Sequence, residues 1–186
     1  MKSTDLALSA LFATLTAVGA FIQIPFVPVP ITLQTFFVLL SGLLLGARLG
    51  AFSQIIYVLM GVIGLPVFAG GTSGIGVVTG PTGGYLIGFV AGAYVVGLIV
   101  QKGLGEKYVH EKRKGYLIRD AIALGLGIFV IYFFGILQLM NFLGIGLYSA
   151  MELGVIPFLL GDLVKTILAI SLAERVRKSG VLGLTS

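Results

Sequence analysis

An acidic and a basic residue stand three positions apart in an otherwise apolar stretch near the end of the sequence. Asp162 and Lys165 lie in the segment IPFLLGDLVK. This spacing places both side chains on one face of a helix, within reach of each other. Ionisable residues inside a membrane helix cost free energy, are usually paired and often mark a functional site. The pair therefore predicts a polar binding site, with a purely structural ion pair as the alternative.

Other patterns that carry chemistry are missing from the sequence. There is no cysteine, which excludes a disulfide framework, a thiolate metal site and a cysteine nucleophile. No G-x-x-x-x-G-K phosphate-binding loop occurs, and the single histidine, His110, stands in a charged segment. We therefore expect no metal, no cofactor and no enzyme activity, but a binding protein that depends on something else for energy.

The composition is that of an integral membrane protein. Of the 186 residues, 58% are hydrophobic and only 10% are charged, whereas soluble domains carry about 25% charged residues. The net charge of +5 comes from loops between apolar segments and does not indicate nucleic-acid binding. The length suits a single transmembrane substrate-binding domain, residues 1–186.

Six apolar segments predict an all-α fold of six transmembrane helices. A spanning helix needs about 20 residues, and the first segment is longer than the apolar region of a signal peptide, which has about 7–15 residues. The expected helices cover residues 6–24, 32–46, 49–63, 84–100, 120–142 and 156–175.

Basic residues orient these helices. Cytoplasmic loops of membrane proteins carry an excess of Lys and Arg. If both termini are cytoplasmic, eleven of the twelve Lys and Arg residues fall inside, including Arg48 and those of the 102–119 segment, and Lys165 is the exception. The sequence therefore predicts a multi-pass protein of the cell membrane with both termini in the cytoplasm.

Residues 64–85 form a Gly/Pro-rich segment, GLPVFAGGTSGIGVVTGPTGGY. The segment lies within a longer stretch, residues 49–101, that contains no Asp, Glu, Lys, Arg or His. Gly and Pro disfavour helix, so we expect none between Pro66 and Pro81. Lipid cannot satisfy irregular backbone, which must line a cavity or be buried in protein. We expect an outer loop that dips into the bundle and forms the lid and part of the wall of a ligand pocket; a mobile linker is the alternative.

Small and polar residues mark other surfaces. Ser9, Ala13 and Ala17 recur every fourth residue and would let another helix approach closely. The alternative is that they are ordinary small residues of an apolar helix and have no such role. A glycine stripe in the helix at 84–100 has the same property. Thr32, at the start of the second helix, is either a helix cap or a pocket group, and a cap is the preferred interpretation.

Several segments resemble the BioY family, the biotin-specific S-component of energy-coupling-factor (ECF) transporters. The combination of GPTGGY with the later GD-x-x-K is the most specific part. Arg48 follows Gly-Ala where the family pattern leads us to expect Gly-Pro, which affects the cytoplasmic turn and not the site. The similar segments are PVPITLQTFFVLLSGLLLGARLG (28–50), GLPVFAGG (64–71), GPTGGYLIGF (80–89) and IPFLLGDLVK (156–165).

The resemblance implies a biotin-capture protein that docks through its first helix, with Ser9, Ala13 and Ala17, on a transmembrane coupling subunit above two ATPases. In the pocket it implies, Asp162 accepts from the urea N–H groups of biotin and Lys165 donates to the urea oxygen; Lys165 on the biotin carboxylate is the reverse assignment. The other expected contacts are Gln34 at one side, Phe68 and Tyr85 over the sulfur ring, and backbone N–H groups of Gly70, Gly71, Thr72 and Ser73 at the carboxylate.

An intramembrane enzyme is the weakest alternative, because no nucleophile–base pair is readable in the sequence, and two other functions stay open. One is an S-component for another vitamin, which competition among biotin, riboflavin and thiamine would identify. The other is a self-sufficient proton-coupled carrier that uses Asp162, for which uptake would persist without ATPase partners and collapse with an uncoupler.

Overall fold

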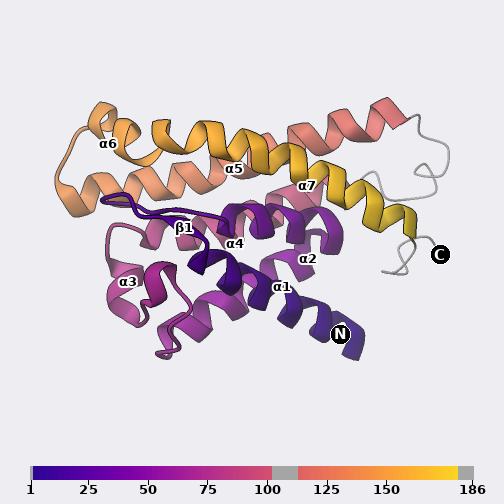
Figure 1. The fold of residues 1–186 in the computed structure, drawn as a ribbon, viewed down its shortest axis with the longest axis horizontal. Coiled ribbons are helices and arrows are strands. Elements are labelled where there is room, and N and C mark those ends of the chain that lie inside the picture. Colours follow the sequence, from indigo (N-terminus) through magenta and orange to yellow (C-terminus); the bar gives the residue numbers. More distant parts are fainter. Residues whose placement is uncertain (1, 102–112, 180–186) are drawn as a thin grey trace.

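The computed structural model describes residues 2–101 and 113–179. Helices dominate, and they pack as a layer of α5 and α7 over a layer of α1, α2 and α4, with α1 beginning and α7 ending at the same end of the molecule (Figure 1). The elements, with η for 3-10 helices, are α1 Ser3–Phe21, β1 Gln23–Ile24, β2 Ile31–Thr32, α2 Gln34–Val62, η1 Ala69–Gly71, α3 Ile75–Thr79, α4 Gly83–Gln101, α5 Arg113–Leu143, α6 Leu147–Gly154, η3 Ile156–Phe158 and α7 Leu159–Ser179.

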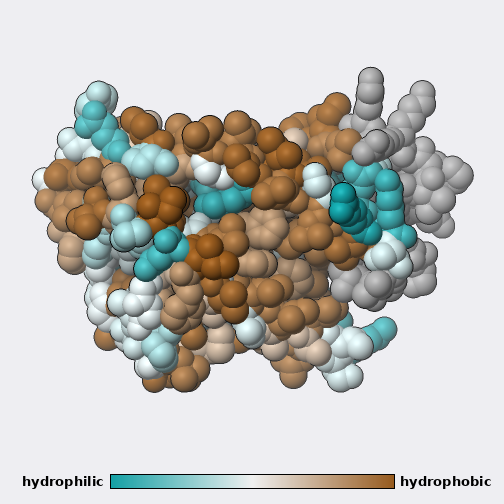
Figure 2. All heavy atoms as spheres, viewed as in Figure 1, coloured by the Kyte–Doolittle hydropathy of each residue, from teal (hydrophilic) through white to brown (hydrophobic). Residues whose placement is uncertain are grey.

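The expectation of a mostly helical membrane protein is confirmed. Within the described ranges, five helical segments are long and apolar enough to cross a membrane: Ser3–Phe21, Gln34–Val62, Gly83–Gln101, Tyr116–Leu143 and Leu147–Ser179. Figure 2 shows apolar side chains along most of the flank and hydrophilic ones gathered mainly toward the two ends. This distribution is what a bilayer requires of a protein that spans it.

Helix α2 changes direction at Gly46. Its φ of 76° and ψ of −176° lie in a region that is essentially restricted to glycine. The two halves of α2 then lie against each other, because Gln54 Nε2 donates to Ser41 Oγ over 3.3 Å and a Cβ on Gly50 would lie 3.1 Å from the Cα of Gly42. The sequence analysis predicted that one helix ends and the next begins at this point.

The segment between α2 and α4, residues 63–82, is more ordered than expected. The prediction of no helix between Pro66 and Pro81 is wrong, because η1 and α3 both lie there. Residues 75–79, IGVVT, contain no proline, so one helical turn can form after Gly74, whose φ is 91°. Gly74 N–H donates to the carbonyl of Gly61 over 2.7 Å, which ties the segment to the end of α2.

Two connections also differ from expectation. The loop expected after the fifth helix contains α6, which begins beyond Gly144 with its φ of 65°. The first helix, expected to reach residue 24, ends at Phe21, and Gln23–Ile24 pairs with Ile31–Thr32 in a two-stranded antiparallel ribbon. Most of the 102–119 segment, including His110, lies outside the described residues.

The small residues of α1 face the interior of the protein. Ser9 and Ala13 are 0% exposed and Ala17 is 8% exposed, and α1 packs mainly on α2. The prediction that this stripe docks on a partner is therefore wrong for this structure. The close approach that small side chains permit is made within the chain.

The glycine stripe of α4 does mediate close packing. A Cβ on Gly84 would lie 2.2 Å from the carbonyl oxygen of Phe134, and one on Gly88 would lie 2.8 Å from the Cα of Ile131. Both contacts are with α5, so a side chain at either position would push α4 and α5 apart.

A buried ion pair joins three helices near the end of α7. Arg177 Nη1 lies 2.5 Å from Asp120 Oδ2, and Arg177 Nη2 donates to the carbonyl of Leu43 over 2.8 Å. Asp120 is 1% exposed and Arg177 is 5% exposed. The pair connects α5 and α7 to the first half of α2, near its change of direction.

Candidate functional site

A cavity of about 490 Å³ lies between α2, α4, α5, α7 and the 63–82 segment. Ligand pockets commonly have volumes of roughly 300–1,000 Å³ and mostly apolar walls with a few polar groups. The lining residues are Val29, Pro30, Thr32, Gln34, Thr35, Phe68, Ala69, Thr72, Ser73, Gly76, Val77, Pro81, Thr82, Tyr85, Leu86, Phe89, Ile131, Tyr132, Phe158, Asp162 and Lys165.

Asp162 and Lys165 form the predicted ion pair. Lys165 Nζ lies 2.9 Å from Asp162 Oδ1, and the two residues are 8% and 3% exposed, respectively. Asp162 belongs to the first turn of α7, where the helix dipole favours a negative charge. The local spacing of three residues thus produced the expected contact, and both side chains line the cavity.

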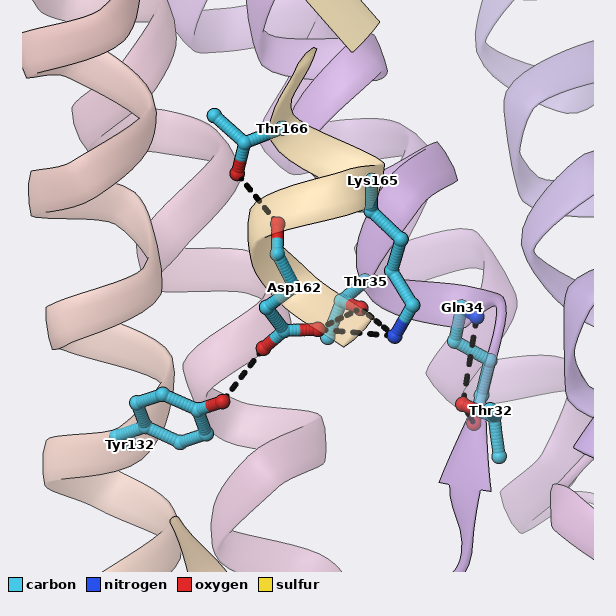
Figure 3. Close-up of polar contacts among 7 residues, drawn as sticks. All are labelled: Thr32, Gln34, Thr35, Tyr132, Asp162, Lys165 and Thr166. Carbon is cyan, nitrogen blue, oxygen red and sulfur yellow. Dashed lines mark hydrogen bonds and ion pairs between the residues drawn. The ribbon is translucent and has the colours of Figure 1, made fainter. Parts of the chain in front are cut away.

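Thr35 and Tyr132 complete the polar group around this pair. The Thr35 hydroxyl donates to Asp162 Oδ1 over 3.1 Å and accepts from Lys165 Nζ over 2.9 Å. The Tyr132 hydroxyl donates to Asp162 Oδ2 over 2.5 Å. Figure 3 shows Asp162 and Lys165 projecting from α7 toward Thr35, with Tyr132 reaching Asp162 from α5.

These hydrogen bonds leave some donors and acceptors of the Asp162–Lys165 pair unused and therefore available to a ligand. A carboxylate has about four lone-pair sites and an ammonium group has three N–H donors. Asp162 accepts three hydrogen bonds and Lys165 Nζ donates two, so about one acceptor site and one donor remain. Because the two charges already neutralise each other, the pair suits a neutral group that offers both N–H and C=O.

Gln34, the residue before Thr35, is held by a second set of hydrogen bonds. The Thr32 hydroxyl donates to Gln34 Oε1 over 2.9 Å, and Gln34 Nε2 donates to the Tyr57 hydroxyl over 2.5 Å. Gln34 N–H also donates to Thr32 Oγ1 over 3.3 Å. The cap interpretation of Thr32 is not confirmed, because the N-cap of α2 is Leu33. Thr32 instead lines the cavity, which is the alternative that the sequence left open.

Phe68 and Tyr85 form parts of the apolar wall. Phe68 is 1% exposed, and its ring meets that of Tyr57 edge-on with the centroids 5.6 Å apart. The Tyr85 hydroxyl donates to the carbonyl of Gly154 over 2.8 Å, which turns its polar end away from a ligand. Both residues line the cavity, as do the predicted Thr72 and Ser73.

Gly70 and Gly71 are not among the residues that line the cavity. Their φ values of 70° and 72° turn the chain so that they face the N-terminal elements. A Cβ on Gly70 would lie 3.4 Å from Gln23 Nε2, and one on Gly71 would lie 3.7 Å from Phe21 Cε1. Gly71 N–H donates to the Phe68 carbonyl over 3.0 Å. The prediction that these two glycines contact a ligand carboxylate therefore does not agree with this structure.

Two tyrosines, Tyr132 in the site and Tyr57 behind its wall, were not expected from the sequence, and neither was the contact of Thr35 with α7. Tyr132 is the only tyrosine in residues 120–142, and Tyr57 is the only one in residues 49–63. A buried tyrosine hydroxyl normally finds a partner, so a lone tyrosine in an apolar span was a usable signal. Thr35 stands beside Gln34, and its contact with α7 joins residues 127 positions apart.

Comparisons with known proteins agree on one family. A family model described as the BioY family matches residues 1–180. A probable biotin transporter BioY of Pyrococcus horikoshii is 42% identical over 177 residues, which cover 95% of this chain and 98% of the relative. The biotin transporter BioY of Thermotoga maritima is 42% identical over 170 residues, which cover 91% of this chain and 94% of the relative.

A solved structure has the same fold. The crystal structure at 2.1 Å of the S-component for biotin from an ECF-type ABC transporter matches with a TM-score of 0.81 and 28% sequence identity. The match covers 96% of this chain and 95% of the other. The arrangement of helices around the cavity is therefore shared with a solved protein over nearly the whole chain.

Proposed function

The chain belongs to the BioY family, and on that premise we propose that it captures biotin as the S-component of an ECF transporter. The observation that carries the proposal is the cavity of about 490 Å³ with one buried ion pair on a mostly apolar wall. Biotin is an apolar bicycle with a cyclic urea and an acyl tail that ends in a carboxylate. A mostly apolar cavity with one polar group on its wall suits that distribution of polarity.

The urea is the group that the Asp162–Lys165 pair suits. It is neutral, and one of its two N–H donors and its carbonyl match the remaining acceptor site of Asp162 and the remaining donor of Lys165. A carboxylate beside the pair would add a second negative charge that no further cation of the lining residues would balance. We therefore assign the urea to this pair and the biotin carboxylate to the region of Thr72 and Ser73.

The membrane arrangement that we propose has six crossings in one domain of residues 1–186. The change of direction at Gly46 supports counting α2 as two crossings. The common end of α1 and α7 (Figure 1) and the distribution of Lys and Arg support two cytoplasmic termini in the cell membrane. A transmembrane coupling subunit and two ATPases would supply energy, and we expect neither a metal nor a cofactor.

Binding of biotin to the purified protein tests the function. In equilibrium dialysis with radiolabelled biotin, we expect saturable binding of one molecule per chain, because one buried Asp162–Lys165 pair lines the proposed cavity. Unlabelled biotin should displace the label, while riboflavin and thiamine at the same concentration should not. Saturable binding of radiolabelled riboflavin or thiamine, with no saturable binding of radiolabelled biotin, would assign the chain to another vitamin.

Cysteine labelling tests the orientation. The chain has no cysteine, so Ser73→Cys and Ser179→Cys each introduce a single reactive thiol. With intact cells and a membrane-impermeant maleimide, we expect Ser73→Cys to react and Ser179→Cys to react only after the cells are opened. Labelling of Ser179→Cys in intact cells would contradict the proposed orientation.

A further inference from the structure

A directed series of hydrogen bonds runs from the cavity wall to the 63–82 segment. The Tyr57 hydroxyl donates to the carbonyl of Val67 over 3.2 Å, and a carbonyl oxygen can only accept. The Tyr57 oxygen must therefore accept from Gln34, which places Nε2 toward Tyr57 over 2.5 Å. Gln34 Oε1 then faces Thr32, whose hydroxyl donates to it over 2.9 Å.

This series fixes which atom of the Gln34 amide points where. Nε2 uses one N–H on Tyr57 and Oε1 uses one lone pair on Thr32. One N–H and one lone pair remain for a ligand, because a side-chain amide has two donors and two acceptor sites. Gln34 lines the cavity, so the positions of this donor and acceptor depend on Tyr57.

Tyr57 itself is placed behind the wall. Its exposure is 0%, and it is not among the residues that line the cavity. Its ring packs edge-on against Phe68, the residue after Val67, so the same side chain contacts Gln34 on one side and the 63–82 segment on the other. A residue in this position can affect a ligand only through those neighbours.

We propose that Tyr57 is a positioning residue for the ligand: its hydroxyl orients the Gln34 amide and holds the 63–82 segment against it. The inference rests on the proposed function, since biotin is the ligand through which it is tested. Without the hydroxyl, the amide of Gln34 can rotate and the Val67 carbonyl loses its partner. Both changes should let a bound ligand leave sooner.

Tyr57→Phe tests the proposal, because it removes the hydroxyl and keeps the ring. We expect the dissociation rate of radiolabelled biotin from the purified protein to rise about 10-fold, the loss of roughly one hydrogen bond. The association rate should change by less than about 2-fold, because the residue is buried and does not line the cavity. Tyr94→Phe, the same change at a side chain that is 46% exposed, should leave both rates unchanged.

A double-mutant cycle tests whether the effect passes through Gln34. Non-additivity between two substitutions measures their coupling. Gln34→Met will weaken binding by itself, and in that background Tyr57→Phe should change the affinity by clearly less than about 10-fold, because only the loss of the contact with the Val67 carbonyl remains. A full 10-fold effect in the Gln34→Met background would overturn the role of Tyr57 in orienting the amide.

A second variant covers the case in which Tyr57→Phe does not fold. Thr32→Val preserves the shape and removes the hydroxyl that donates to Gln34 Oε1, so it should speed biotin dissociation by several-fold and also lose its effect in the Gln34→Met background. If biotin dissociates at the wild-type rate from both Tyr57→Phe and Thr32→Val, the inference about Tyr57 is overturned, while the proposed function is unaffected. Failure of the wild-type protein to bind biotin would instead overturn the proposed function.

Discussion

Asp162→Asn should weaken biotin binding by about 10- to 100-fold. The carboxylate accepts from Lys165, Thr35 and Tyr132, and asparagine keeps one oxygen but loses the charge. Hydrogen bonds to charged groups contribute roughly 1.5–3 kcal/mol, and each ~1.4 kcal/mol is a factor of ten. The measurement is equilibrium dialysis with radiolabelled biotin on protein that is monodisperse in detergent.

Lys165→Met and a neutral analogue separate the two assignments of this pair. If Lys165 serves the urea, the substitution should weaken biotin and biotin amide by the same factor, because both keep the urea. If Lys165 serves the carboxylate, biotin should lose far more affinity than the amide. Equal losses are the result that we expect from the neutralised pair.

The matched control is an acid-to-amide change outside the cavity. Glu152 is exposed on α6 and does not line the cavity, so Glu152→Gln should leave the affinity for biotin unchanged. Wild-type affinity in both Asp162→Asn and Lys165→Met would remove the pair from the binding site and leave it as a structural ion pair.

The part of the site that the sequence predicted depends on local spacing. Asp162 and Lys165 are one helical turn apart, so their contact needs no knowledge of the rest of the fold. The contacts of Asp162 with Thr35 and Tyr132 join residues 127 and 30 positions apart. Such partners are set by how the helices pack, which a single sequence does not specify.

The sequence also did not predict which neighbours the glycines and other small residues face. Gly70 and Gly71 belong to the expected loop, but their positive φ values direct them toward the N-terminal elements. Ser9 and Ala13 were correctly seen as a surface for close helix packing, but the spacing does not say which helix is the neighbour. The structure places α2 there.

The helix positions were better predicted, because long apolar runs separated by Gly, Pro or charge are strong signals. The errors lie where tertiary contacts overcome a weak local preference. Residues 75–79 form one helical turn against the expectation for a Gly/Pro-rich segment, with Gly74 bonded to the end of α2. Helix α6 similarly occupies a connection that was expected to be a loop.

Arg177→Met should lower the free energy of unfolding by about 3–5 kcal/mol, the usual effect of removing one partner of a buried ion pair. The substitution removes the guanidinium that lies 2.5 Å from Asp120, which is 1% exposed, and leaves that carboxylate with the longer contact of 3.5 Å to Arg119. It also removes the donor to the Leu43 carbonyl. Thermal unfolding of the detergent-solubilised protein measures this loss, and the double variant Asp120→Leu with Arg177→Met should recover much of it.

Lys178→Met is the control for this prediction, because Lys178 pairs with Glu174 over 2.6 Å with its side chain 67% exposed. Exposed pairs contribute only about 0–1 kcal/mol, so this neighbouring change should barely alter the unfolding temperature. Arg177 stands twelve residues after Lys165, which is about 18 Å along the helix, so the folded fraction of Arg177→Met should bind biotin with wild-type affinity. Equal losses of stability in Arg177→Met and Lys178→Met would show that the buried pair does not hold α5, α7 and α2 together.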